Sequence, residues 1–250
     1  MLPVILVLGG FFGGFVDAIA GGGGLITLPV LIMAIGTPVD AIASNKIVGT
    51  VGAFIALLVY RRAGHLDWRK GVAFTAWVAL GSLMGSSLSP WIPAHVLRWV
   101  IICVCPLILW VVWRKDSLVV EFKPRLDGGP TAKVSLPRLA AAGIACGFYD
   151  GAVGPGGGTF MFLGLLYVVK LPLLPAMAVT KLSNTFSAGT ALCNFAISGH
   201  VHWAMGAMVA SGMAVGAFIG AKYATRQAAR IVRPVLTLVV VLLLLKLMVS

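Results

Sequence analysis

Long apolar runs separated by short polar segments form the main pattern of the chain. Residues 4–36 are apolar apart from four consecutive glycines, Gly21 to Gly24, and the single charge of Asp17. Glycine is a poor helix former, so this stretch predicts two helices of about 16 and 12 residues, the second short of the roughly 20 that cross a bilayer. Irregular backbone in a membrane is tolerated only inside protein or beside a water-filled cavity. We therefore expect a broken or re-entrant hairpin.

Further helices are predicted after this hairpin. Residues 37–60 predict one long helix, because Thr-Pro-Val-Asp places favoured residue types at the N-cap (Thr37) and in the first turn. Two more spans are predicted near residues 72–90 and 96–113. Residues 114–138 are the only substantial polar stretch, and we interpret them as a basic cytoplasmic linker.

The pattern starts again after the linker. Gly147-Phe148-Tyr149-Asp150 has the form of Gly14-Phe15-Val16-Asp17, and a second glycine-rich run follows it. A constant spacing of 135 positions relates Ala41, Lys46, Thr50, Gly64, His65, Trp68, Gly71, Gly81, Gly85 and Arg98 to Ala176, Lys181, Thr185, Gly199, His200, Trp203, Gly206, Gly216, Gly220 and Arg233. Lys, His, Trp and Arg recurring in one register indicate a duplication. We expect a first transmembrane repeat at 1–113 and a second at 139–250.

The charges of the loops indicate that the two halves have opposite orientations. Basic residues follow Tyr60, fill the linker and recur in a predicted loop at 222–233, and cytoplasmic loops are enriched in such residues. The segment 198–203, which corresponds to the first basic loop, has no Lys or Arg, so we expect it outside. The predicted fold is an all-α integral membrane protein with two inverted-topology repeats of about five helical segments each, both termini lying outside.

Composition supports a membrane protein and argues against other classes. Hydrophobic residues make up 60% of the 250 residues and charged residues 10%, against about 25% charged in soluble domains, so a lipid bilayer is the expected environment. The net charge of +12 lies in short loops, which favours the positive-inside pattern over nucleic-acid binding. We expect no cleavable signal, and the cysteines have no metal-ligand spacing. Without a nucleophile–base set or a cofactor motif, we predict no enzyme, no cofactor and no metal.

Two lysines carry the candidate chemistry. Lys46 and Lys181 lie about eight or nine residues from the predicted helix starts, or roughly 12–13 Å at 1.5 Å per residue. Inverted repeats bring both ammonium groups toward the midplane of a hydrocarbon core about 30 Å thick. A lysine at that depth costs roughly 2.5–3.5 kcal/mol on insertion scales, which calls for a function. We predict that the two lysines form the anion-binding site of a transporter.

Hydrogen-bonding groups accompany the lysines. Thr50 and Thr185 lie four positions after them and Asn184 three positions after Lys181, on the same helix faces. Backbone N–H groups of glycine runs also suit anion binding. The candidates in the glycine runs are Gly22, Gly23, Gly24, Gly156, Gly157 and Gly158.

Asp17 and Asp150 leave structural alternatives open. Buried charges in membranes pair with one another, so each lysine would then only neutralise an aspartate, or the aspartates would tune the lysines or couple transport. The glycine runs have an alternative role in close helix crossing. Gly81 and Gly85, and the corresponding Gly216 and Gly220, favour helix packing over chemistry.

The duplicated Gly-x-x-Asp and glycine-rich segments, followed by helices containing Asn45-Lys46 and Thr180-Lys181, resemble the TauE/SafE family of sulfite exporters and related organosulfonate permeases. The resemblance covers nearly the whole chain. It implies transport of sulfite or of small sulfur-containing or carboxylate anions across the bacterial cytoplasmic (inner) membrane. It adds Asn45 and Thr180 to the expected site. Because the halves differ at these positions and at Pro155, an asymmetric site is expected.

The resemblance, with no acidic coupling relay evident beyond Asp17 and Asp150, favours a multi-pass carrier that exports a small anion electrogenically, since a negative-inside membrane potential drives an anion outward. An anion channel, a carboxylate transporter and a non-transporting membrane subunit stay open as alternatives. A homo-oligomer is compatible with the sequence.

Overall fold

The computed structural model describes residues 1–66, 68–93, 136–154 and 156–249. These residues are helical apart from short connections and contain no strand, so the predicted all-α class is confirmed. The helices are α1 (Leu2–Ala20), α2 (Gly24–Ile35), α3 (Pro38–Arg62), α4 (Trp68–Leu88), the 3-10 helix η1 (Ser89–Trp91), α7 (Leu136–Ala152), α8 (Gly157–Tyr167), α9 (Leu173–Ile197) and α10 (Trp203–Val249). The predicted span at 96–113 and nearly all of the predicted linker lie outside the described residues.

Two broken hairpins, α1–α2 and α7–α8, follow from the glycine runs. Gly21 ends α1 with a φ of 75°, and its N–H donates to the Asp17 carbonyl oxygen at 2.8 Å. Gly156 precedes α8 with a φ of 81°. Such left-handed conformations cost glycine little, so the chain reverses direction within a few residues. Because α2 has 12 residues and α8 has 11, both are shorter than a span, and the predicted broken hairpin is confirmed.

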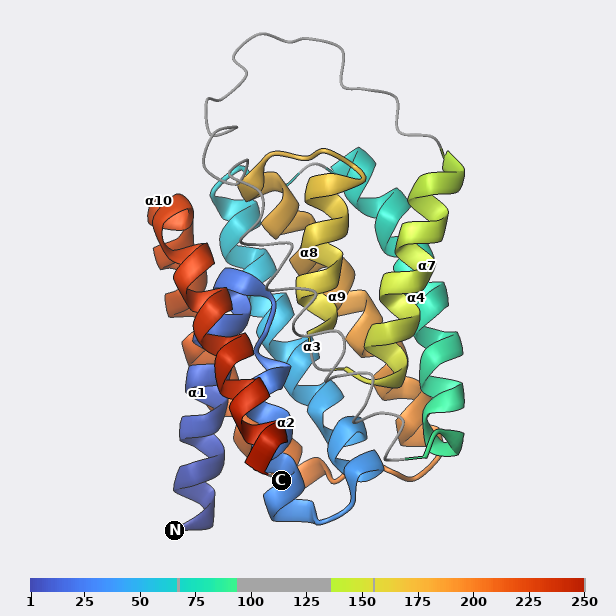
Figure 1. Ribbon diagram of the computed structural model, residues 1–250, viewed down its shortest axis with the longest axis vertical. Coiled ribbons are helices and arrows are strands. Elements are labelled where there is room, and N and C mark those ends of the chain that lie inside the picture. The colour runs from blue at the N-terminus through green and yellow to red at the C-terminus, as the bar shows by residue number, and fades with distance from the viewer. Residues whose placement is uncertain (67, 94–135, 155, 250) are drawn as a thin grey trace, which may run out of the picture.

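The long helices α3 and α9 pack against each other and run in opposite directions, as Figure 1 shows. The α1–α2 hairpin enters from the lower end of the view and the α7–α8 hairpin from the upper end (Figure 1). Helix α1 packs along α10, and α7 packs along α4. The first helix of each half therefore packs against a long helix of the other half. The inverted orientation of the repeats in a membrane stays a prediction.

Glycines allow close packing of these two helix pairs, α1 with α10 and α4 with α7. A Cβ added at Gly81 or Gly85 of α4 would overlap carbonyl oxygens of α7, and one added at Gly216 or Gly220 of α10 would overlap carbonyl oxygens of α1. Glycines spaced four apart let two helix backbones approach closely. The packing interpretation of both Gly-x-x-x-Gly pairs is therefore confirmed.

Apolar side chains cover much of the outside of the bundle. Large exposed ones on α1, α4 and α10 include Leu8, Phe12, Leu80, Leu83, Val215 and Phe218. Within the described residues, four helices are long and apolar enough to cross a membrane, while α2 and α8 are shorter apolar helices. An apolar exterior around a polar interior is the arrangement expected in lipid.

Two local predictions need correction. The basic loop predicted at 222–233 is shorter than expected. A break at Gln227, with φ −139° and ψ 27°, divides α10 into two helices, and the chain reverses direction there (Figure 1). Alanine and arginine, which are strong helix formers, flank the break and keep the neighbouring residues helical. Thr37 takes the predicted N-cap position but makes no capping hydrogen bond. Its hydroxyl donates to Asp40 Oδ2 at 2.6 Å instead.

Candidate functional site

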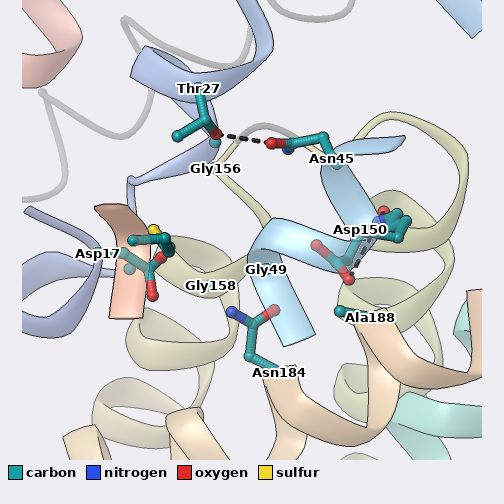
Figure 2. Close-up of a pocket in the computed structure, with 14 residues that line it drawn as sticks. Asp17, Thr27, Asn45, Gly49, Asp150, Gly156, Gly158, Asn184 and Ala188 are labelled. Atoms are coloured by element: carbon teal, nitrogen blue, oxygen red, sulfur yellow. Dashed lines mark hydrogen bonds and ion pairs between the residues drawn. The ribbon is translucent and has the colours of Figure 1, made fainter. Parts of the chain in front are cut away.

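A polar cavity of about 30 Å³ lies where the turns of both hairpins meet α3, α9 and α10 (Figure 2). It is lined by Asp17, Gly21, Gly24, Thr27, Asn45, Lys46, Gly49, Asp150, Gly154, Gly156, Gly158, Asn184, Ala188 and Met213. About 10–15 Å³ of such space is enough to hold one water. The cavity therefore has room for water, and its polar lining is open to a small polar ligand.

Lys181 of α9 pairs with Asp17 of α1. Its Nζ lies 2.7 Å from Asp17 Oδ2 and also donates to the Asp17 carbonyl oxygen. The other carboxylate oxygen accepts the N–H of Gly23 at 3.3 Å. The ammonium thus contacts both the carboxylate and the carbonyl oxygen of Asp17, which also accepts the Gly21 N–H, near the C-terminus of α1, where the helix dipole favours a cation.

Lys46 of α3 pairs with Asp150 of α7 in the corresponding way. Its Nζ lies 3.4 Å from Asp150 Oδ2 and donates to the Asp150 carbonyl oxygen near the end of α7. The same carboxylate oxygen accepts the hydroxyl of Ser187 at 2.5 Å. This ion pair is longer than that of Lys181, and Ser187 supplies part of the carboxylate's hydrogen bonding.

Both ion pairs cross between the halves. The lysine of the first half meets the aspartate of the second half, and the lysine of the second half meets the aspartate of the first. All four side chains are at most 6% exposed. The structural alternative considered from the sequence, in which lysines neutralise aspartates, therefore describes the observed contacts, and the question becomes which lysine can also reach a ligand.

In this conformation Lys46 can reach a ligand in the larger cavity and Lys181 cannot, because the cavity is lined by Lys46 but not by Lys181. Lys181 and Thr180 instead line a separate cavity of about 10 Å³, together with apolar neighbours that include Phe162 and Met177. The hydroxyl of Thr180 is buried without a hydrogen-bond partner in the described part of the chain. The expectation of an asymmetric site agrees with this difference.

Two amides complete the polar lining. Asn45 Oδ1 accepts the hydroxyl of Thr27 at 2.6 Å, which leaves its amide N–H groups as donors. Figure 2 shows Asn184 on the opposite wall of the cavity. Together with Lys46, these side chains offer several hydrogen-bond donors to one small volume, which suits an oxyanion.

The sequence-predicted residues divide into two groups. Those brought together around the larger cavity are Asp17, Gly24, Asn45, Lys46, Asp150, Gly156, Gly158 and Asn184. The others predicted for the site, which do not line this cavity, are Gly22, Gly23, Thr50, Gly157, Thr180, Lys181 and Thr185. The hydroxyls of Thr50 and Thr185 donate to carbonyl oxygens of their own helices, those of Lys46 and Lys181.

Sequence reasoning missed several contributors. Thr27 was detectable, since it is the only hydroxyl-bearing residue of α2. Ser187 lies three positions after Asn184 and so shares its helix face. Gly49, Ala188 and Met213 carry no polar signal, and only the packing of α3, α9 and α10 places them at the cavity.

A second polar cluster lies away from the cavity. His200, in the α9–α10 connection, has its Nδ1 2.7 Å from Asp40 Oδ1 in the first turn of α3. His202 Nε2 lies 3.7 Å from the other carboxylate oxygen, and its backbone N–H donates to Ser44 Oγ at 2.9 Å. This cluster joins the two halves at one end of the bundle. In the described residues, no group of His, Cys, Asp and Glu is arranged to hold a metal ion.

Comparisons with known proteins agree with this arrangement. The family model described as "Sulfite exporter TauE/SafE" matches residues 6–247. The chain belongs to the sulfite exporter TauE/SafE family. The members of this family are membrane transporters, so the chain belongs to this class. The family resemblance inferred from the sequence is confirmed.

Relatives from three bacteria match this chain over most of their own lengths. "Probable membrane transporter protein ORF9" of Sinorhizobium sp is 31% identical over 99% of this chain and 92% of its own length. A "probable membrane transporter protein" of Haemophilus influenzae is 32% identical over 95% and 91%. YfcA of Escherichia coli, also described as a probable membrane transporter protein, is 31% identical over 96% and 87%. No solved structure matches the chain.

Proposed function

We propose that this TauE/SafE-family membrane transporter is a carrier for a small oxyanion, with sulfite or an organosulfonate as the favoured substrate class. The carrying observation is Lys46, a buried ammonium that faces a polar cavity between two broken hairpins. Charge-assisted hydrogen bonds from an ammonium are about twice as strong as neutral ones. The amides of Asn45 and Asn184 add donors for further oxygens of the same anion.

The position of the cavity supports a carrier over an open channel. It lies between two broken hairpins, one from each half, and a central site between two repeats is the arrangement used by alternating-access carriers. We place the protein in the bacterial cytoplasmic membrane and favour export, which is the direction that the family description names. No chemical conversion of the anion is proposed, since the site offers donors and charges without a nucleophile.

The test is sulfite and ethanesulfonate flux in proteoliposomes that contain only this chain. The parent protein should show saturable flux and counterflow, which a channel or a non-transporting subunit does not show. Lys46→Ala should lower anion affinity at least tenfold, because loss of the charge and of its hydrogen bond together exceeds about 1.4 kcal/mol.

Lys222→Ala is the matched control. Lys222 is an exposed lysine on α10, away from the cavity, so its loss should leave affinity unchanged while removing the same formal charge. Folded Lys46→Ala protein that transports both anions like the parent would contradict the proposed site.

A further inference from the structure

The buried charges around the cavity sum to zero. Among the residues whose burial the structure describes, the buried ionisable residues with a formal charge are Asp17, Lys46, Asp150 and Lys181. Two carboxylates and two ammonium groups balance. A singly charged anion entering this neutral group leaves one net negative charge in a low-dielectric interior, which is strongly unfavourable without compensation.

The two aspartates are not equally able to compensate. Asp17 has its Lys181 partner at 2.7 Å and a backbone N–H on its other oxygen. Asp150 has its lysine at 3.4 Å, and that lysine is the one facing the cavity. An anion that binds Lys46 therefore competes with Asp150 for the same ammonium and leaves the Asp17–Lys181 pair intact.

We propose, building on the proposed anion transport, that a singly charged oxyanion binds together with one proton, which is held on Asp150. The Lys46 ammonium turns from the Asp150 carboxylate to the anion, and a proton from water bonds to the freed carboxylate. The site carries no net charge before or after binding. Transport of such an anion is then electroneutral, and its net direction follows the anion and proton gradients rather than the membrane potential.

The surroundings of Asp150 support this assignment. On α3 it faces Lys46, on α9 Ser187, and one turn earlier on its own helix the thiol of Cys146. Asp17 of α1 lies on the same cavity, and its negative charge further disfavours a second free carboxylate there. Lys181 is the other cation nearby, and it is bound to Asp17.

Ser187 provides a place for the added proton's hydrogen bond. Its hydroxyl lies 2.5 Å from Asp150 Oδ2 and donates to the carboxylate when that is ionised. A hydroxyl is both donor and acceptor, so the same contact serves a protonated Asp150 with the direction reversed. The backbone carbonyl of Ser187 is fixed independently by the hydroxyl of Ser82 on α4, at 2.7 Å.

The experiment uses ethanesulfonate, an anion of a strong acid, so that any proton taken up belongs to the protein. Purified protein in weakly buffered detergent should take up about one proton per bound anion, and affinity should rise about tenfold for each pH unit lowered. An infrared difference spectrum should show a new protonated carboxyl band on binding. In proteoliposomes, flux should not respond to potentials set with valinomycin and potassium.

Asp150→Asn should abolish the proton uptake and the new band and make the flux respond to membrane potential. Asp40→Asn, which removes a carboxylate at the end of the bundle, should keep both signals. Anion binding without proton uptake in the parent, or uptake that persists in Asp150→Asn, overturns the proposal while leaving anion transport standing. Absence of any binding and flux for sulfite and ethanesulfonate overturns both.

Discussion

At the scale of single residues, the two lysines occupy equivalent sequence positions but have different surroundings. Lys181 is 2% exposed, makes a short ion pair and lies against apolar side chains such as Phe162. Lys46 is 4% exposed, has a longer ion pair and lines the polar cavity. In a buried ion pair without access to water, each charge depends on the other for its stabilisation. Under the proposed function, we therefore expect Lys181 to serve mainly the fold and Lys46 to serve both the fold and the ligand.

This difference predicts unequal effects on stability. Lys181→Ala leaves Asp17 as a buried charge without its cation, and breaking such a pair costs about 3–5 kcal/mol. Lys46→Ala should cost less, because its ion pair is longer, at 3.4 Å against 2.7 Å, and Asp150 retains the hydroxyl of Ser187 at 2.5 Å. The measurement is thermal unfolding of both variants in the same detergent.

A double variant provides the control. Lys181→Met combined with Asp17→Asn removes both charges and should recover much of the stability that Lys181→Ala loses, since no buried charge is then left without its partner. Equal losses for the two alanine variants would contradict the division of roles between the lysines.

At the scale of helices, close backbone contact joins two helix pairs, each of which has one helix from either half. Helix α4 meets α7 through Gly81 and Gly85, and α10 meets α1 through Gly216 and Gly220. These contacts matter for the site because α1 and α7 carry Asp17 and Asp150. A shift of α7 away from α4 would move Asp150 relative to Lys46, and so the helix contact sets the geometry of the ion pair.

Gly85→Ala should therefore destabilise the protein and weaken anion binding together. The added Cβ would overlap the Phe148 carbonyl oxygen and lie 2.9 Å from the Ala152 backbone nitrogen. Overpacking of this kind costs about 1–3 kcal/mol. Unfolding temperature and ethanesulfonate affinity measured on one preparation test both effects.

Gly164→Ala on α8 is the matched control, because its added Cβ meets only Cys146 Sγ at 3.7 Å. Ala at a helical position that tolerates it is favoured over Gly by about 0.5–1 kcal/mol, so this variant should be as stable as the parent or slightly more so. If Gly85→Ala behaved like Gly164→Ala, the close contact of α4 and α7 would not be a determinant of the site.

Elements of this protein were easier to predict from the sequence than the contacts between them. The glycine runs, the Thr-Pro helix start and the apolar runs identify the hairpins and α3 because these signals are local. The basic run at 222–233 contains the break at Gln227, but its length overstated the turn, since charge indicates a side of the membrane and not where a helix ends. The partner of Lys46 lies 104 positions away, and only the packing of α3 against α9 and of α7 against α4 determines that the charges pair across the halves.

At the scale of the whole molecule, the halves depend on each other. Each half supplies a lysine for the other half's aspartate and a long helix for the other half's hairpin. The cavity is lined by residues of both halves, which include Met213 of α10. A motion that enlarges the cavity therefore changes contacts in both halves at once, which is the behaviour that a carrier with one central site requires.

The distribution of charge gives the molecule two distinct ends. The end of α3 with Arg61 and Arg62, the start of α7 with Arg138, and the α8–α9 connection with Lys170 lie at the upper end of Figure 1. The α9–α10 connection lies at the lower end, with His200 bound to Asp40. Cytoplasmic segments are enriched in Lys and Arg, so the upper end is expected inside the cell.

Cysteine labelling tests this orientation and with it the inverted repeats. Ala63 and Ser198 follow the ends of the corresponding helices α3 and α9, and both are exposed. They suit substitution better than the neighbouring Gly64 and Gly199, whose φ values of 77° and 76° disfavour a side chain.

On a background in which Cys103, Cys105, Cys146 and Cys193 are replaced, an impermeant maleimide added to intact cells should label Ser198→Cys and not Ala63→Cys. Inside-out vesicles should reverse the result, because the two ends of antiparallel α3 and α9 face opposite sides. Labelling of both positions from one side would mean that the corresponding loops share a compartment. The opposed hairpins of the fold would then have to be oriented in the membrane in some way other than inverted repeats.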